Sequence, residues 1–404
     1  MSTRDDWREI GGVDALDVAI PPRPSTGGGW LQPLRTRAAL GLSPVVAPAV
    51  LFVPIGIALG PAVSNVLSPA VLGYLEAVVA VALAVLGVFV GLALDLRTAR
   101  DRRLFVAAGA EAAVTIVLVT GAFLVLLFAW QMPLGLPVAL TALTLGLCAA
   151  ASSATSAEDH SEMQAVATRI ADLDDVLPVV LSGLVVVMLG SPESMPLWQA
   201  VGWLFRTLVL GISIGTAGWL LFERAHSRSE RNVFIAGTVA LIGGTSAYLG
   251  LSPLLAGLMA GLLWVWLPGH ADRVVREDLQ RVQHPLIVVL LLVAGASCEF
   301  SRQAVWLSGP LVLFRLTGKL TGGWIATRLQ GRVSAGDLGG HLIAPGLLGI
   351  AIALHVLQVV PSVGLSALLT AVVVATLASE ALTLVLRPDH SDDEDDSMSP
   401  EPVA

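Results

Sequence analysis

Three ionisable residues lie in segments that are otherwise apolar enough to cross a lipid bilayer. Lys319 is the only lysine of the 404-residue chain and lies within 303–328, a stretch long enough to span a membrane. Asp174 and Asp175 lie in a second apolar segment, 171–189 (ADLDDVLPVVLSGLVVVML). A charge inside a bilayer is costly unless it is paired or hydrated, so such residues usually carry function. One lysine and two carboxylates are the parts of an ion and proton pathway.

The two aspartates cannot both face one partner, because adjacent residues on a helix point about 100° apart. One can pair with Lys319 while the other faces an ion cavity. A monovalent cation such as Na+ prefers oxygen ligands, which Asp175, Thr155, Ser153 and freed backbone carbonyls can supply. The competing interpretation is a structural salt bridge between helices, which does not account for the second aspartate.

Three further residues are weaker candidates. Glu111 and Arg315 lie deep in their spans and are predicted to pair with each other, in a structural role rather than in ion binding. His160 follows the serine-rich segment at the predicted cytoplasmic mouth, where a histidine can sense pH, although a solvated loop is the simpler interpretation.

Composition indicates an all-α polytopic membrane protein. The chain is 55% hydrophobic and 13% charged, with a mean hydropathy of +0.79, whereas soluble domains contain about 25% charged residues. The catalytic motif HExxH does not occur, so neither an enzyme nor a cofactor is expected, and nucleic acid is not an expected partner. The two cysteines, Cys148 and Cys298, are predicted to be packing residues.

Hydropathy divides the chain into twelve spans. The predicted extents are 43–65, 71–95, 104–130, 136–156, 164–190, 198–222, 232–250, 252–268, 284–300, 304–328, 341–361 and 363–386. With both ends cytoplasmic, nearly all loop arginines fall inside and only Arg302 outside, as the positive-inside rule requires. We therefore expect a multi-pass protein of the plasma (inner) membrane. Residues 1–40 are predicted to be a disordered lead, 41–388 the membrane domain and 389–404 a disordered acidic tail.

Two short signatures recur along the chain. Residues 53–60 (VPIGIALG) match 254–261 (LLAGLMAG), and 91–96 (GLALDL) match 295–300 (GASCEF), so the offsets of 201 and 204 are nearly equal. Small-residue faces are common in membrane helices, which weakens either match alone. Together they predict two inverted repeats joined by the sixth span, an organisation typical of secondary transporters.

Two counterpart spans are expected to break inside the membrane. Residues 148–157 (CAAASSATSA) end the fourth span with little bulk and several hydroxyls, which can replace missing backbone hydrogen bonds. The eleventh span carries Pro345, Gly346 and Gly349. Facing helix ends would present partial charges to an ion. Close packing of small residues is the alternative interpretation.

The chain resembles the monovalent cation:proton antiporter superfamily, on its sodium/proton exchanger side. The resemblance rests on six segments in order: PIGIALGP (54–61), LGVFVGLALDL (86–96), ATS (154–156), LDDV (173–176), LGLSPLLAGLMAGL (249–262) and RLTGK (315–319). The resemblance covers roughly 45–386. It implies crossed broken helices in spans four and eleven, a core of spans 3–5 and 10–12, and a dimerisation domain of spans 1–2 and 7–9, with span 6 as linker. It also implies a homodimer, Asp175 as the ion- and proton-carrying carboxylate, and Asp174 paired with Lys319.

The predicted function is exchange of protons for a monovalent cation, with Na+ first and Li+ or K+ as alternatives, by alternating access through Asp175 and Thr155. The paired-aspartate version of the family is associated with electrogenic exchange. Three departures from the family bear on selectivity: Ala157 stands where proline is frequent, the eleventh span lacks a polar group at its break, and no helix is expected before the first span, where many members have one. A sodium-coupled symporter of a small organic anion is the main alternative, and a channel is disfavoured because there is no filter-like segment.

Overall fold

The computed structural model describes residues 48–94, 99–131, 136–153, 162–190, 197–268, 271–330, 338–360 and 363–386. The regular elements in these ranges are helices. Their bounds are α1 Pro48–Leu59, α2 Pro69–Ala93, α3 Ala99–Trp130, α4 Val138–Ala150, α5 Glu162–Asp174, α6 Val176–Leu189, α7 Leu197–Arg224, α8 Arg228–Tyr248, α9 Pro253–Trp266, α10 Ala271–Ala296, α11 Arg302–Gln330, α12 Leu338–His341, α13 Leu347–Val359 and α14 Val363–Leu386. The predicted lead (1–40) and acidic tail (389–404) lie outside the described residues.

The helices follow the twelve predicted spans, with one correction. The fifth span is not one helix but two, α5 and α6, which meet at Asp175. The boundary between the seventh and eighth spans lies where expected, because Ser252 caps α9 through a hydrogen bond from Leu255 N to its Oγ (3.3 Å) and Pro253 occupies the first helical turn.

Four helical segments of the described chain are long and apolar enough to cross a membrane by themselves: Pro69–Ala93, Arg102–Trp130, Trp198–Arg224 and Gly364–Thr383. Five shorter apolar helices, of 10–17 residues, accompany them. Two of the short ones, α4 and α13, are parts of the spans that break. The described residues thus fit an integral membrane protein with several interrupted crossings.

The fourth and eleventh spans cross at their breaks. The helix α4 ends at Ala150 and residues 151–153 are extended, so that Ser152 forms an antiparallel bridge with Pro345, just before α13. The backbone N–H of Ser153 donates to the carbonyl of Ala344 (3.0 Å). The chains approach so closely that a Cβ at Gly346 would lie 2.9 Å from the Ser152 carbonyl oxygen, which explains the glycine. Both predicted breaks are therefore present.

The packing of the helices reflects the predicted inverted repeat. The first span packs on the ninth (α1 on α10), and its repeat partner, the eighth, packs on the second (α9 on α2). The repeated glycines lie at related contacts: Gly295 abuts Gly56, and its counterpart Gly91 abuts Gly261, one turn beyond the counterpart of Gly56. A side chain at these positions would collide with the neighbouring backbone, so close helix contact accounts for the sequence repeat.

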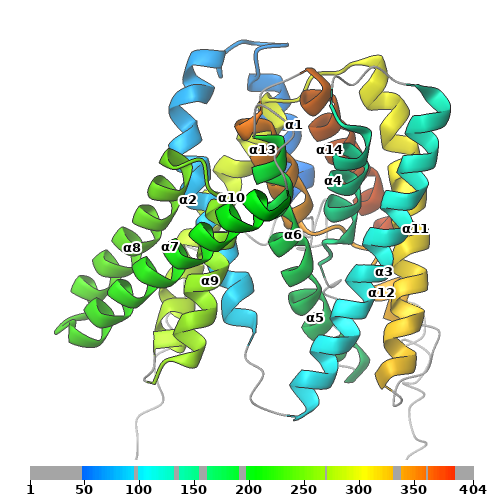
Figure 1. Ribbon diagram of the computed structural model, residues 1–404. Helices are drawn as coiled ribbons and strands as arrows, with labels where there is room; N and C mark the ends of the chain where they lie inside the picture. The colour runs from blue at the N-terminus through cyan, green and yellow to red at the C-terminus, as the bar shows by residue number, and fades with distance from the viewer. Residues whose placement is uncertain are drawn as a thin grey trace, which may run out of the picture. The chain divides into compact units, whose positions relative to one another are not determined.

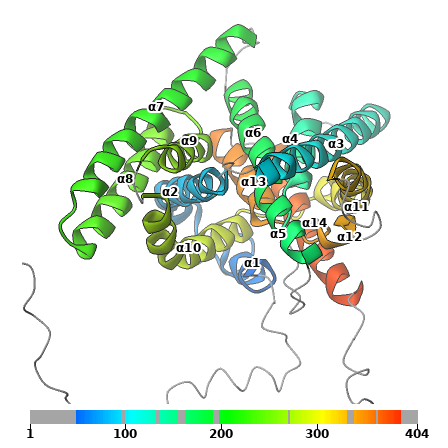
Figure 2. The same cartoon turned by 90° about the horizontal axis from the view of Figure 1, so that it is seen from below.

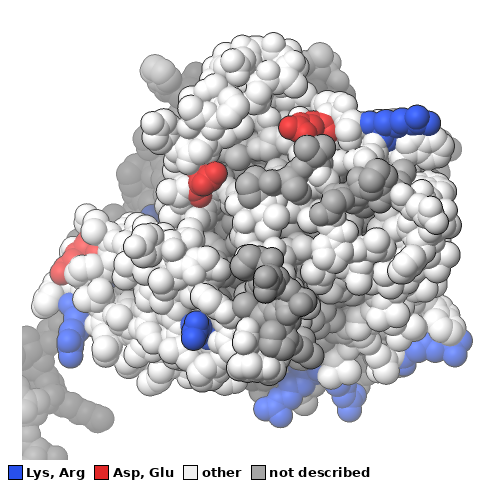
Figure 3. Space-filling model, turned by 45° about the horizontal axis from the view of Figure 1, so that its top comes forward, with Lys and Arg blue, Asp and Glu red and all other residues white. Residues whose placement is uncertain are grey.

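The helix that carries Lys319, α11, lies beside α3 and the broken fourth span. The views of Figures 1 and 2 show α3 and α11 side by side, and α3 also packs along α4. The helices α7 and α8 pack against each other and against α9, away from that group. Uncharged residues cover most of the face shown in Figure 3, as expected for a surface in contact with lipid.

Candidate functional site

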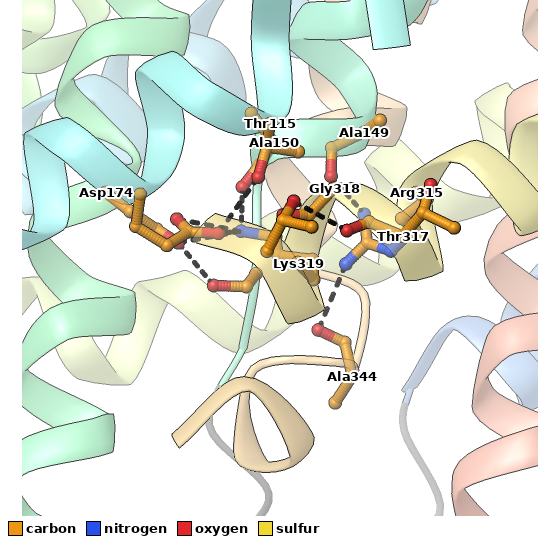
Figure 4. A network of polar contacts seen from close by, with 12 residues as sticks. Thr115, Ala149, Ala150, Asp174, Arg315, Thr317, Gly318, Lys319 and Ala344 are labelled. Carbon is orange, nitrogen blue, oxygen red and sulfur yellow. Dashed lines mark hydrogen bonds and ion pairs between the residues drawn. The ribbon is translucent and has the colours of Figure 1, made fainter. Parts of the chain in front are cut away.

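Lys319 is buried at the centre of a polar network (Figure 4). Its Nζ lies 3.0 Å from Asp174 Oδ2 and 3.1 Å from Glu111 Oε1, and it also donates to the carbonyl oxygen of Ala150 at the end of α4. All three charged side chains are fully buried. An ammonium has three N–H donors, and three acceptors surround this one.

Asp174 is held on the same oxygen by a second donor. The hydroxyl of Ser152, in the extended segment after α4, donates to Asp174 Oδ2 at 2.5 Å. The other carboxylate oxygen, Oδ1, is buried and has no hydrogen-bond partner among the described residues. The ion pair expected between Asp174 and Lys319 is present and joins the fifth span to the tenth, while the Ser152 hydroxyl joins Asp174 to the broken fourth span.

Arg315 does not pair with Glu111 as the sequence analysis expected. Its guanidinium donates to the carbonyl of Ala149 (2.8 Å) and to that of Ala344 (3.2 Å), one in each broken span. The last carbonyls of a helix have no intrahelical partner, so a cation at this end is favourable. Glu111 instead meets Lys319, one turn further along α11, where Gly322 lets the two helices approach. The side chain of Thr115 donates to Glu111 Oε1 (3.1 Å).

Asp175 faces away from this network. It lies between α5 and α6 and lines a cavity of about 460 Å3, together with Ser152, Ser153, Asp172, Gln283, Thr376 and Glu380. Its Oδ1 has no hydrogen-bond partner among the described residues. The two adjacent aspartates are thus divided: one is bound by Lys319 and Ser152, whereas the other borders an open space.

The remaining predicted site residues are Ser153, which the structure describes, and Thr155 and His160, which lie outside the described residues. The hydroxyl of Ser153 donates to the carbonyl of Pro345 (3.0 Å) and so stabilises the crossing. Ser153 also lines the Asp175 cavity. Thr155, predicted to share a cation with Asp175, lies outside the described residues, and so does His160. The described residues offer a cation the Asp175 carboxylate and serine oxygens around the break, together with other oxygen-bearing side chains of the cavity such as Asp172, Thr376 and Glu380.

Two groups of the network were absent from the predicted site. Ser152 belongs to the run of hydroxyls that signalled a broken helix, but the sequence does not indicate which hydroxyl reaches Asp174. The Ala150 carbonyl has no sequence signal of its own, because any residue can supply a backbone oxygen. Both follow from the place where α4 stops.

Comparison with known proteins connects this geometry to a fold. No family model and no curated protein matches the sequence. Among solved structures, the sodium proton antiporter MjNhaP1 from Methanocaldococcus jannaschii at pH 8 matches 87% of this chain and 91% of its own, with a TM-score of 0.59 and 13% identity. The chain has a cation:proton antiporter fold. It is an all-α polytopic membrane protein with two inverted repeats and crossed broken helices, as the sequence resemblance implied.

In this fold, the polar network around Lys319 lies at the crossing of the two broken spans. The crossing of α4 with the segment before α13 lies at the breaks of both spans, and the two cations of α11 bind carbonyls freed there. Half-helices with freed backbone groups at a crossing are the usual ion sites of inverted-repeat transporters.

Proposed function

We propose that this protein is a secondary active antiporter that exchanges protons for a monovalent cation, with Na+ as the first candidate, and that Asp175 carries the proton and the cation in turn. The observation that carries the proposal is the division of the two aspartates. Asp174 is occupied by Lys319 and Ser152, whereas Asp175 lines a cavity beside the crossing of two broken helices. A carboxylate in that place can hold either ion but not both.

The charges around Asp175 support this role. The buried network contains two carboxylates, Glu111 and Asp174, and two cations, Lys319 and Arg315. These four charges sum to zero and so do not neutralise an ionised Asp175, and the other charged residues of its cavity, Asp172 and Glu380, are acidic as well, which leaves neutralisation to a mobile ion. A buried charge without a partner is unfavourable, which favours loading by a proton or a cation before the site changes its exposure.

Two cavities support alternating access. The cavity at Asp175 is bordered by the C-terminal part of α2 and the start of α13, including Val90 and Leu348. A second cavity of about 740 Å3 is bordered by the opposite ends of the same two helices, including Glu76 and His355. Between the two cavities, Leu83 and Ala351 are fully buried. If the helices that carry the site moved relative to α2, α8 and α9, one of the two cavities would close and the other would open.

The proposed division of the chain follows from this motion. Spans 3–5 and 10–12 would form the moving core, spans 1–2 and 7–9 a dimerisation domain, and span 6 the linker, with a homodimer in the plasma (inner) membrane and both termini cytoplasmic. Thr155 would contribute a cation ligand with Asp175, and His160 would lie at the cytoplasmic mouth. Glu111 and Arg315 are proposed as structural partners of the network.

The test is dissipation of a preset pH gradient in proteoliposomes by Na+, Li+ or K+ added separately. We expect at least one cation to dissipate the gradient with the wild-type chain and none with Asp175→Asn. Asp172→Asn, which changes a carboxylate of the same cavity, is the matched control and should retain exchange. Normal exchange by a well-folded Asp175→Asn protein would refute the assignment.

A gradient that no cation dissipates would favour the symporter of a small organic anion. The described lining of the Asp175 cavity argues against that function, because its charged members, Asp172, Asp175 and Glu380, are acidic and would repel an anion.

A further inference from the structure

A second charged cluster lies where α8 and α10 meet, away from the network around Lys319. Asp278 of α10 is only 5% exposed, and arginines approach it from three positions: Arg228 (3.5 Å), Arg231 (3.9 Å) and Arg281 (3.5 Å). One carboxylate cannot neutralise three guanidinium groups, so these four residues carry two positive charges in excess. The side chains of Arg228 and Arg281 remain 57% and 60% exposed.

An apolar groove begins at this cluster. A cavity of about 240 Å3 lies between α2, α8 and α10, and Asn232, Asp278 and Arg281 form its polar end. Its other lining residues are almost all aliphatic, among them Val81, Val85, Ile235, Val239, Val282 and Leu286. The space is therefore charged at one end and hydrocarbon-like along the rest.

The sequence of both helices puts the charged end at the edge of the apolar zone. Within α8, charged residues occur only among the first four, Arg228 to Arg231, and the rest of the helix to Tyr248 has none. Within α10, the last charged residue is Arg281, and the segment from Pro285 to Ala296 is apolar. Arginines in this position lie at the level of lipid headgroups in a membrane protein, on the side where anionic lipids attract them.

We propose that this groove, bounded by α2, α8 and α10, binds an anionic phospholipid of the surrounding leaflet. The phosphate lies among Arg228, Arg231 and Arg281, and one acyl chain lies along the aliphatic lining. Guanidinium groups match phosphate oxygens with paired hydrogen bonds, and Asp278 orients the arginines without cancelling their charge. An ion alone would not need the aliphatic lining, and a neutral lipid would not need the arginines.

The position of the groove connects it to the Asp175 cavity. Val85 and Val282 line the groove, whereas the next residues, Leu86 and Gln283, line the Asp175 cavity on the other side of the same helices. A lipid in the groove therefore contacts the wall of that cavity. Binding itself is independent of the proposed antiport, so the test below uses no transport readout.

The test is a titration of the delipidated, detergent-solubilised full chain with dioleoylphosphatidylglycerol, followed by native mass spectrometry and thermal unfolding. We expect one tightly bound phosphatidylglycerol and a raised melting temperature, with much weaker binding of dioleoylphosphatidylcholine. The double variant Arg228→Gln/Arg281→Gln should bind phosphatidylglycerol roughly thirtyfold more weakly, because each basic residue near an anionic headgroup contributes about a factor of five. Val282→Trp should fill the groove and prevent binding while leaving the arginines in place.

The matched control is Arg206→Gln/Arg328→Gln, which removes two arginines that lie over tryptophan rings outside the groove. This control should bind phosphatidylglycerol like the wild type. Equal affinity for the two phospholipids, or equal stabilisation by glycerol 3-phosphate, would overturn the proposal. So would a groove occupied by a second copy of the chain, seen as a dimer that Val282→Trp dissociates without any effect on lipid binding.

Discussion

Glu111 and Lys319 form a fully buried ion pair across α3 and α11, with Lys319 Nζ 3.1 Å from Glu111 Oε1. The lysine is therefore shared between two carboxylates, since Asp174 lies at 3.0 Å on its other side. Sequence reasoning assigned Glu111 to Arg315; the four charges sum to zero in either scheme, but in the structure Lys319 has two anionic partners and Arg315 binds backbone carbonyls.

Removal of Lys319 should destabilise the protein strongly. Lys319→Ala leaves Glu111 and Asp174 buried without their cation, and breaking a buried ion pair costs about 3–5 kcal/mol. The additional change Glu111→Gln should restore part of the loss, because it removes one of the stranded charges. Thermal unfolding in detergent measures both effects. A single variant that melts at the wild-type temperature would contradict the shared pairing.

Exchange should be electroneutral, in contrast to the behaviour associated with paired-aspartate members of the family. Because Glu111, Asp174, Lys319 and Arg315 sum to zero, Asp175 carries one proton or one monovalent cation and both loaded states have the same charge. Cation-driven proton flux in proteoliposomes should then be insensitive to an imposed membrane potential. Moving one elementary charge across the membrane changes the free energy by about 2.3 kcal/mol per 100 mV of potential. A mechanism that exchanges two protons for one cation would therefore show a clear dependence of the flux on the potential.

Glu111→Gln provides the comparison for that experiment. Without the second carboxylate, Lys319 has only Asp174 as an anionic partner, so the lysine can release its proton during the cycle. We expect this variant to become sensitive to the membrane potential. Thr115→Val, which removes the neutral hydrogen bond to Glu111 and leaves the charges unchanged, should remain insensitive.

The apparent KM for the cation should rise as the pH falls. Protons and cations compete for Asp175 in the proposed mechanism, so each pH unit in the acid range should raise the KM about tenfold, as for competition by one proton. The maximal rate at saturating cation should change much less. Initial rates of cation uptake between pH 5 and 9 measure this relationship. A KM that is constant while the maximal rate falls would place the proton on another group.

The two serines of the broken fourth span should differ in their effect on stability. Ser152→Ala removes a hydrogen bond to the ionised Asp174, a type worth about 1.5–3 kcal/mol, whereas Ser153→Ala removes a bond to the Pro345 carbonyl, a neutral type worth about 1 kcal/mol. Thermal unfolding of the two variants should rank them in that order. The reverse order would show that Asp174 relies on Lys319 alone.

The spans, the breaks and the repeat were predictable because each depends on local sequence. Long apolar segments define crossings, and the run 148–157 and Pro345–Gly346 mark the places where helices stop. The division of Asp174 and Asp175 also follows from helical geometry. The split of the fifth span at Asp175 was missed, although Pro178 marks it: this proline has no N–H to donate to the carbonyl of Asp174, four residues earlier, so the helix is interrupted there.

The sequence by itself determined that this chain spans a membrane, that spans four and eleven break, and that a lone lysine needs an acidic partner. Only the tertiary structure decided that Lys319 takes Glu111 as well as Asp174, that Arg315 binds the carbonyls of Ala149 and Ala344, and that Ser152 reaches Asp174. Those partners depend on how α3, α4 and α11 are rotated and how closely they pack. Rotation and spacing are set by contacts between residues far apart in the chain, which local patterns do not encode.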